Sequence, residues 1–240
     1  MGVVLLAVGA LATAGCGGSG TPDAISSSTQ KRTVDLAELP ADQVLAAARV
    51  AAHAARSVHV TGDISRGGRR TTLDLRLRDG GDGRGSITTT GGRIDLVRTR
   101  RDLYFRADQA TLTQVLGPDR AREADGRFVK VAVGDATFRS LRDLLDMDTL
   151  FEALLFPKGT LSRVDGIPLG GVPTVGLRDE DPTSGGLLYV AASGSPYPLL
   201  LRPDDTGDGE FELRLGEWNA DVQVARPPAG ETVDVEALNN

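Results

Sequence analysis

The sequence predicts an α+β fold: a strongly curved antiparallel sheet of about ten strands, a half-barrel, with helices filling its concave side. Three observations lead to this fold. Short segments with apolar residues at every second position occur on both sides of a central helical block. Clusters of glycine and aspartate separate these segments, as expected for tight turns in an antiparallel meander. A sheet of about ten normally twisted strands must curl, so helices can fill its inner side.

The first 15 residues are typical of a secretory signal. Val3–Leu11 is an uncharged apolar run, too short to span a bilayer as a helix, and it leads to Cys16, the only cysteine. Thr13–Gly15 with Cys16 resembles the lipobox at which lipoprotein signal peptidase cuts, and in that family of signals the cysteine carries diacylglycerol on its sulfur. A lone cysteine is more often a small buried residue, but the surrounding glycines cannot build a core. We therefore expect residues 1–15 to be a lipoprotein signal peptide and Cys16 to be lipidated.

A tether and one domain are expected after the signal. Gly17–Arg32 is rich in Gly, Ser and Thr, which predicts that the lipidated cysteine and tether, residues 16–32, hold a folded domain off a membrane surface. Residues 33–240 are long enough for a single domain with its own core. No later segment approaches roughly 18 consecutive apolar residues, so we expect no transmembrane helix.

The composition excludes one class of partner. The net charge of −6 argues against nucleic acid, because a phosphate-backbone binder needs a basic face. Aromatic residues make up only 4% of the chain, so the core must be built from Leu, Val, Ile and Ala.

The first element of the domain is a helix over Asp42–Arg56. Asp42 can cap its N-terminus, and apolar residues recur at helical spacing from Val44 to Ala55. From Ser57 the period changes from 3.6 to 2, which predicts strands. Clean alternation also predicts that one face of the sheet is wet and the other covered. The alternating segments before the helical block are 58–64, 73–77, 94–96 and 103–105.

The central block contains three predicted helices with apolar stripes. One covers 108–116, and two more lie between 137 and 156, with Asp148 as the expected N-cap of the last one. Pro157 and Gly159 are expected to end that helix. The stripes consist of Leu112, Val115 and Leu116; Phe138, Leu141, Leu144 and Leu145; and Leu150, Phe151, Leu154 and Leu155.

Strands resume after Thr160, again separated by glycine-rich turns. They are expected at 161–164, 172–178, 187–192, 197–202, 210–215 and 221–224.

Weak motifs recur in a recognisable order along nearly the whole mature chain. They are the lipobox at Cys16, the strand Val58–Ile64, and the segments Arg93–Arg98, Asp102–Phe105, Gly126–Val131, Gly166–Pro173, Leu187–Val190 and Tyr197–Leu199. In order and spacing they resemble the lipoproteins of Gram-positive actinobacteria and mycobacteria of the LppX, LprA, LprF and LprG type. The resemblance implies a half-barrel closed by helices, similar to carriers of the LolA type. It also implies an apolar cavity for acylated lipids or glycolipids, which such proteins help to move through the cell envelope.

The apolar stripes of the predicted helices are the candidate lining of this cavity. Exposing an acyl chain to water is unfavourable by about 0.8 kcal/mol per methylene, and a cavity lined with Leu and Phe removes most of that barrier. The alternative is that the same residues pack tightly against the sheet. An apolar face looks the same in sequence whether it meets protein or ligand.

The sequence contains no recognisable catalytic or metal-binding set. The two histidines, His53 and His59, are expected to be partly buried packing residues. Gly15–Gly20 matches GxGxxG, but no strand precedes it. Asp204–Gly209 resembles a calcium loop but has Leu215 where the bidentate glutamate belongs, which favours a hairpin turn. We therefore expect no enzymatic activity, no metal and no cofactor.

Two basic clusters lie near predicted strand ends. They could dock anionic head groups at a membrane surface, or they could be solvated hairpin ends balanced by neighbouring aspartates, the interpretation we favour. The clusters are Arg66, Arg69 and Arg70, and Arg98, Arg100 and Arg101.

Together these features favour an exported protein, lipid-anchored at the outer face of the cell membrane. It is expected to bind an acyl lipid or glycolipid and to carry or hold it without catalysis. The expected partners are this lipid, the membrane, and a membrane transporter or another envelope protein. The alternative is a protein-interaction or sensor lipoprotein of the same fold with a filled core.

Overall fold

The computed structural model describes residues 35–183, 185–204 and 210–239. All of these residues belong to one compact unit, Val34–Asn240. The expected signal peptide, Cys16 and the tether lie outside the described residues, as does most of the glycine-rich segment Asp204–Gly209.

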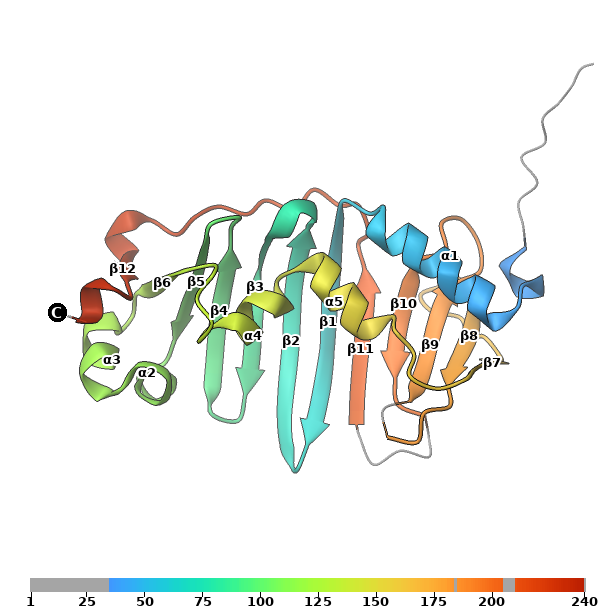
Figure 1. Ribbon diagram of the computed structural model, residues 1–240, viewed down its shortest axis with the longest axis horizontal. Coiled ribbons are helices and arrows are strands. Elements are labelled where there is room, and N and C mark those ends of the chain that lie inside the picture. The colour runs from blue at the N-terminus through green and yellow to red at the C-terminus, as the bar shows by residue number, and fades with distance from the viewer. Residues whose placement is uncertain (1–34, 184, 205–209, 240) are drawn as a thin grey trace, which may run out of the picture. The chain divides into compact units, whose positions relative to one another are not determined.

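The described chain forms a single open sheet of twelve strands, so the predicted α+β class is confirmed (Figure 1). The order across the sheet is β12-β6-β5-β4-β3-β2-β1-β11-β10-β9-β8-β7. All described pairings are antiparallel except that of β12 with β6. The strands are β1 Ser57–Arg66, β2 Arg69–Arg78, β3 Asp82–Thr89, β4 Gly92–Arg98, β5 Asp102–Ala107, β6 Phe128–Ala132, β7 Leu161–Val164, β8 Thr174–Asp179, β9 Gly186–Ala191, β10 Pro198–Arg202, β11 Glu210–Gly216 and β12 Thr232–Asp234.

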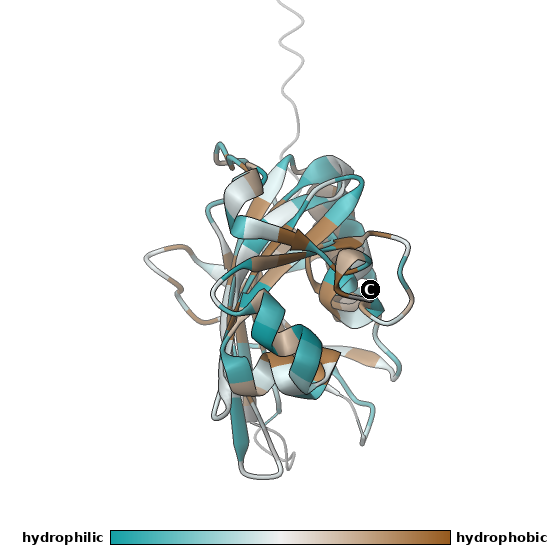
Figure 2. Ribbon diagram, turned by 90° about the vertical axis from the view of Figure 1, so that its left-hand side faces the viewer, coloured by the Kyte–Doolittle hydropathy of each residue, from teal (hydrophilic) through white to brown (hydrophobic). Residues whose placement is uncertain are grey.

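Within the described residues, five α-helices pack on one face of this sheet (Figure 1). α4 and α5 cross its middle, α1 contacts α5, β7 and β8, and α2 and α3 lie at the β5–β6 end. Their buried residues join those of the strands in one large core. In Figure 2, which colours the ribbon by hydropathy, hydrophobic stretches occur on both strands and helices. Within the described ranges, no helix has both the length and the apolar character needed to cross a membrane. The helices are α1 Ala41–His53, α2 Gln109–Leu116, α3 Pro118–Ala124, α4 Arg139–Leu144 and α5 Met147–Leu154.

Glycines on the inner face allow the sheet to curl toward the helices. Gly62 and Gly85 lie opposite the buried residues Leu213 and Leu75. A Cβ atom on Gly62 would lie 2.1 Å from the Glu212 carbonyl oxygen, and one on Gly85 would lie 2.2 Å from the corresponding oxygen of β2. Neighbouring strands therefore approach more closely here than any side chain would permit, which bends the sheet inward.

The sheet is covered on its outer face as well, over β9 and β10. Leu187 and Tyr189 form a second small cluster with Leu200, against which Ile167 and Leu169 of the β7–β8 connection pack. Inner and outer faces of β9 are therefore both apolar, and its sequence is a continuous run. The expectation that one face of every strand is wet was wrong for this part of the sheet.

Three strands were not predicted, and one predicted strand is absent. β3, β6 and β12 were not expected, whereas 221–224 is irregular chain between β11 and β12. β3 contains glycines, which in a sequence are typical of turns. β12 is three residues long and acquires its strand conformation by pairing with β6 in register Val233–Val129.

The ends of two helices also differ from the predictions. The N-cap of α1 is Pro40, and Asp42 lies inside the first turn. Asp146, not Asp148, caps α5, because its carboxylate accepts the Thr149 N–H at 2.9 Å. α5 ends at Leu154 with Leu155 as its C-cap, two residues before Pro157, so the helix stops where the proline predicted that it would.

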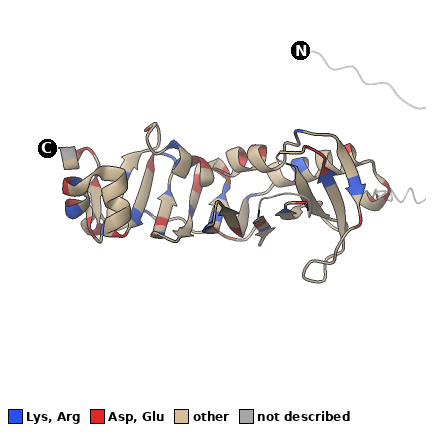
Figure 3. Cartoon of the chain, turned by 90° about the horizontal axis from the view of Figure 1, so that it is seen from below, with Lys and Arg blue, Asp and Glu red and all other residues tan. Residues whose placement is uncertain are grey.

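Charges of both signs alternate along the sheet (Figure 3). Arg70 pairs with Asp63 across β1 and β2, and Arg93 and Arg106 both bond Asp95. Of the second predicted basic cluster, Arg100 and Arg101 border a shallow hollow of about 430 Å³ with Arg78 and Arg226. Arg98 is separate from them, because its side chain turns inward to Asp146.

Candidate binding cavity

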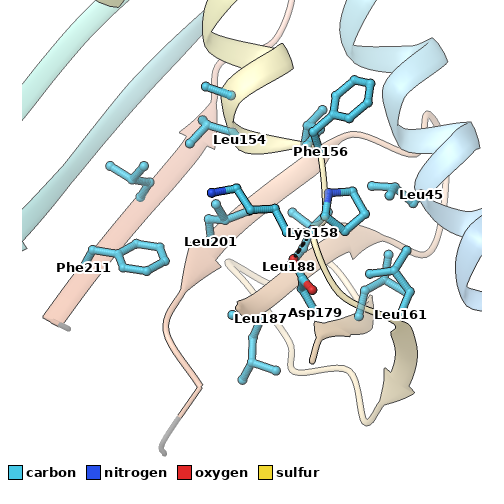
Figure 4. A pocket seen from close by; sticks show the side chains of 16 residues that line it. Leu45, Leu154, Phe156, Lys158, Leu161, Asp179, Leu187, Leu188, Leu201 and Phe211 are labelled. Atoms are coloured by element: carbon cyan, nitrogen blue, oxygen red, sulfur yellow. Dashed lines mark hydrogen bonds between the residues drawn. The ribbon is translucent and has the colours of Figure 1, made fainter. Parts of the chain in front are cut away.

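A cavity of about 260 Å³ lies between the end of α5 and the inner faces of β8–β11 (Figure 4). α1 contributes Leu45 from the other side. Thirteen of its sixteen lining residues are apolar, so its surface is predominantly hydrophobic. The apolar residues are Leu45, Ala153, Leu154, Leu155, Phe156, Pro157, Leu161, Leu177, Leu187, Leu188, Leu201, Phe211 and Leu213.

Strand alternation explains how this lining arises. On β11, Phe211 and Leu213 are two residues apart and point to the same inner face, and Leu201 of β10 is paired with Leu213. Leu177 of β8 is paired in the same way with Leu188 of β9. The cavity wall is therefore a patch of consecutive inward positions on four neighbouring strands.

Several of these apolar side chains are incompletely covered by protein. Leu154, Leu161, Leu201 and Phe211 are only partly buried, although they pack against the main core. Phe156, at the opening, is 64% exposed. A ligand with a hydrocarbon chain would remove this surface from water, which stabilises the complex by roughly 25 cal/mol per Å² of apolar surface.

Asp179 fixes the chain at the cavity mouth. Its Oδ2 accepts the Lys158 backbone N–H at 2.9 Å, and its Oδ1 accepts those of Gly159 and Asp181 at 2.8 and 3.1 Å. Glycine is required at position 159, because a Cβ atom there would lie 2.4 Å from the Asp181 nitrogen. The carboxylate thus holds the segment after α5 against the end of β8.

Arg49 joins α1 to the same segment. Its Nε donates to the Leu155 carbonyl oxygen at 2.8 Å, and its Cζ lies 4.3 Å from the centre of the Phe156 ring. The bond satisfies a carbonyl left open at the end of α5, and the cation lies over the face of the aromatic ring. α1 and the end of α5 therefore form one wall of the cavity.

Most of the predicted lining residues lie away from this cavity. Of the eleven, Leu154 and Leu155 border it. Leu141, Leu144 and Leu150 are partly buried against the main core. Except for Val115, the apolar stripes of α2, α4 and the start of α5 lie in or against the main core.

The remaining six of the predicted lining residues are either exposed to solvent or packed in the core. Val115 is 44% exposed on the outer side of α2, so it lines nothing. Phe138 packs on Phe105 with ring centres 5.2 Å apart, and Phe151 packs on Trp218 at 5.6 Å. The fully packed members of the predicted lining are Leu112, Leu116, Phe138, Leu145 and Phe151.

Sequence reasoning missed the wall formed by the strands. The signal was present, because the inward positions of β8–β11 follow from their period of two. Nothing in the sequence showed which part of the inner face a helix would leave uncovered. The helices leave one part of the inner face uncovered, and this is why the cavity is lined by Leu45, Leu161, Leu201 and Phe211.

The described residues contain no group of three or more His, Cys, Asp or Glu side chains that could hold a metal ion. His59 is partly buried, with Nε2 2.8 Å from Asp74 Oδ1 and Nδ1 3.0 Å from Glu217 Oε1. His53 is exposed, and its Nδ1 lies 3.3 Å from Asp148. Both histidines contact surface carboxylates, and neither lines the cavity.

No protein-family model matches the sequence, and neither does any of the curated proteins compared with it. Solved structures do resemble the fold. LprF from Mycobacterium bovis superimposes with a TM-score of 0.52 at 17% identity, over 78% of this chain and 96% of LprF. The lipoprotein LppX from Mycobacterium tuberculosis gives 0.47 at 15% identity, over 77% of this chain and 99% of LppX. An uncharacterised conserved protein from Thermus thermophilus gives 0.43 at 13% identity, over 81% of this chain and 98% of that protein.

The fold assignment rests on the comparison with LprF. The resemblance predicted from the sequence is thus confirmed for the fold. The open, mostly antiparallel sheet, with its helices on one face, is the shared architecture. The described chain therefore has the same half-barrel fold as LprF.

Proposed function

We propose that this protein is an envelope lipoprotein that binds the acyl chain of a lipid or glycolipid and carries or holds it without catalysis. Residues 1–15 serve as the lipoprotein signal peptide, and residues 16–32 are the lipidated Cys16 and its tether. Residues 33–240 form the binding domain at the outer face of the cell membrane. A membrane transporter or another envelope protein would load or unload the ligand.

The cavity between α5 and β8–β11 is the observation that supports lipid binding most directly. Its walls are leucine and phenylalanine, and its partly exposed side chains are those that a hydrocarbon chain would cover. Transfer of about a dozen methylenes from water to such a site is favourable by on the order of 10 kcal/mol. The same methylenes gain about as much in a bilayer, so the cavity offsets the cost of taking an acyl chain out of the membrane.

A filled-core interaction protein is the second candidate, and one observation favours it. Six of the eleven residues expected to line a cavity are buried in the main core, and only two, Leu154 and the buried Leu155, border the open space. Most of the interior beneath α2–α4 is therefore solid protein. Under this alternative the small cavity would stay empty, and a partner protein would bind an outer surface.

Native mass spectrometry of the full chain distinguishes the two functions. The protein would be produced in a lipid-containing host with Cys16→Ser, so that no acyl group is attached covalently. Bound acyl lipid, released on activation in the gas phase, is the expected result. Reproducible absence of lipid from the folded protein would support the interaction protein instead.

Lipid anchoring is tested separately, by incorporation of labelled palmitate in the producing cell. Label in the unaltered protein and none in the Cys16→Ser variant is expected. Equal labelling of the two would contradict the assignment of Cys16.

A further inference from the structure

We propose that Lys158 binds an anionic head group at the cavity mouth, so that the preferred ligand is a single acyl chain ending in a carboxylate or phosphate. This inference rests on the proposed function and specifies the chemical class of its ligand. The inference rests on three features. They are the turn at Lys158 and Gly159, the apolar cavity beside it, and the Lys158 ammonium as the one cation among the described lining residues.

The backbone at Lys158 sets the direction of its side chain. Asp179 accepts the Lys158 N–H at 2.9 Å and also the N–H of Gly159, which holds this turn against β8. From there the side chain extends past Leu201 toward Phe211, away from the Asp179 carboxylate (Figure 4). Lys158 is an exposed residue, so its methylenes can cover apolar surface while the ammonium stays in contact with water.

The Lys158 ammonium has no counter-charge within the part of the chain that the structure describes. No carboxylate there lies within ion-pair distance of its Nζ, whereas Lys130 lies 3.0 Å from Asp234. The nearest carboxylate in the cavity wall, Asp179, already accepts three backbone N–H groups. An anion from outside can therefore complete this site by charge-assisted hydrogen bonds.

The cavity volume limits the ligand to one chain. At about 260 Å³ the space is just below the range of roughly 300–1,000 Å³ for small-molecule sites. It takes part of one hydrocarbon chain and leaves the head group at the rim, beside Lys158 and Phe156. A second chain has no space among the described residues of the cavity.

A matched set of ligands tests this inference on the full chain carrying Cys16→Ser. Displacement of the neutral fluorophore N-phenyl-1-naphthylamine would be followed for laurate, lauroyl-lysophosphatidate, uncharged monolaurin and two-chain phosphatidylglycerol. The variants are Lys158→Gln, Lys158→Arg and, as a control, Arg84→Gln, which removes a charge on the outer face of β3. The two anionic ligands distinguish a carboxylate head from a phosphate head.

Lys158→Gln is expected to weaken the binding of laurate or lysophosphatidate about fivefold, the effect of losing one partly exposed ion pair. The affinity for monolaurin should not change. Lys158→Arg should retain the affinity, and Arg84→Gln should match the parent protein. An equal effect on monolaurin and laurate, or tighter binding of phosphatidylglycerol than of either anion, would overturn the role of Lys158 while leaving lipid binding intact. No displacement by any ligand would overturn the inference and the proposed function together.

Discussion

Arg98 at the end of β4 donates from Nη1 to Asp146 Oδ2 at 2.6 Å, and the two side chains are 11% and 22% exposed. Asp146 also caps α5, so this single contact joins the sheet to the helix that borders the cavity. Burial alone raises the pKa of Asp146, but the bonds from Thr149 and Arg98 outweigh it and the pKa is lowered. The stabilisation is thus present above the ordinary aspartate pKa of 3.8 and is lost as the pH falls through the lower folded value.

Arg98→Met is expected to lower the free energy of unfolding by about 2–4 kcal/mol at neutral pH, because it leaves a largely buried carboxylate unpaired. Urea denaturation measures this difference. Arg139→Met, an exposed position on α4, is the control and should change stability by less than about 0.5 kcal/mol. Equal stability of the two variants would show that the contact between β4 and α5 is unimportant.

Leu200 and Leu201 are adjacent on β10 but lie on opposite faces of the sheet, so substitutions at the two positions test protein stability and ligand binding separately. Leu201 borders the cavity, so Leu201→Trp should fill it and weaken fluorophore or lipid binding about tenfold or more without loss of stability. Leu200 is packed in the outer cluster, so Leu200→Trp should destabilise by roughly 1–3 kcal/mol and leave binding unchanged. Full binding by a stable Leu201→Trp variant would show that the cavity does not take the ligand.

The curl of the sheet depends on glycine at inward positions. Gly85→Ala places a methyl group 2.2 Å from the Asp74 carbonyl oxygen, and we expect a loss of roughly 1–3 kcal/mol in the free energy of unfolding. Gly134→Ala is the matched control, because nothing lies within 4 Å of the added atom and its φ is not positive. A Gly85→Ala protein as stable as this control would contradict the role of Gly85 in bending.

Glu217 should contribute to the acid sensitivity of the fold. Bonds from Arg76 and His59 lower its pKa from 4.5 to about 2. A lowered folded-state pKa means that its stabilisation is complete above 4.5 and disappears as the pH falls toward 2. Glu217→Gln should therefore show a smaller change in urea midpoint across this interval than the parent protein. The exposed Glu231→Gln is the control, and an identical pH profile for the two variants would contradict the assignment.

The strands with strict alternation were predictable because a period of two maps directly onto the two faces of a sheet. Leu73, Leu75 and Leu77 of β2 illustrate this, since all three are buried on the inner face. β3 was missed because its first residues, Asp82 and Gly83, belong to a glycine and aspartate cluster that predicts a turn. At Gly85 the absence of a side chain is what the bent sheet requires. β12 depends on pairing with β6, about a hundred residues away, and no local pattern encodes it.

The sequence predicted that the candidate site is apolar, but not where in the fold it lies. The sequence showed apolar helix faces and apolar inward strand positions, but not where the two fail to meet. Leu154 and Leu155 border open space because α5 ends there, whereas Phe151, one turn earlier, packs on Trp218. Lys158 was not singled out, because its role depends on the Asp179 turn that directs its side chain.

Both borders of the sheet are formed by very short strands. β12 consists of Thr232–Asp234, and β7 of Leu161–Val164. Long unpaired borders invite strand exchange with neighbouring molecules and lead to aggregation. Because each border offers only a few backbone groups, neighbouring copies can keep this twelve-stranded sheet without joining edge to edge. Removal of the last ten residues would uncover β6, and self-association should follow.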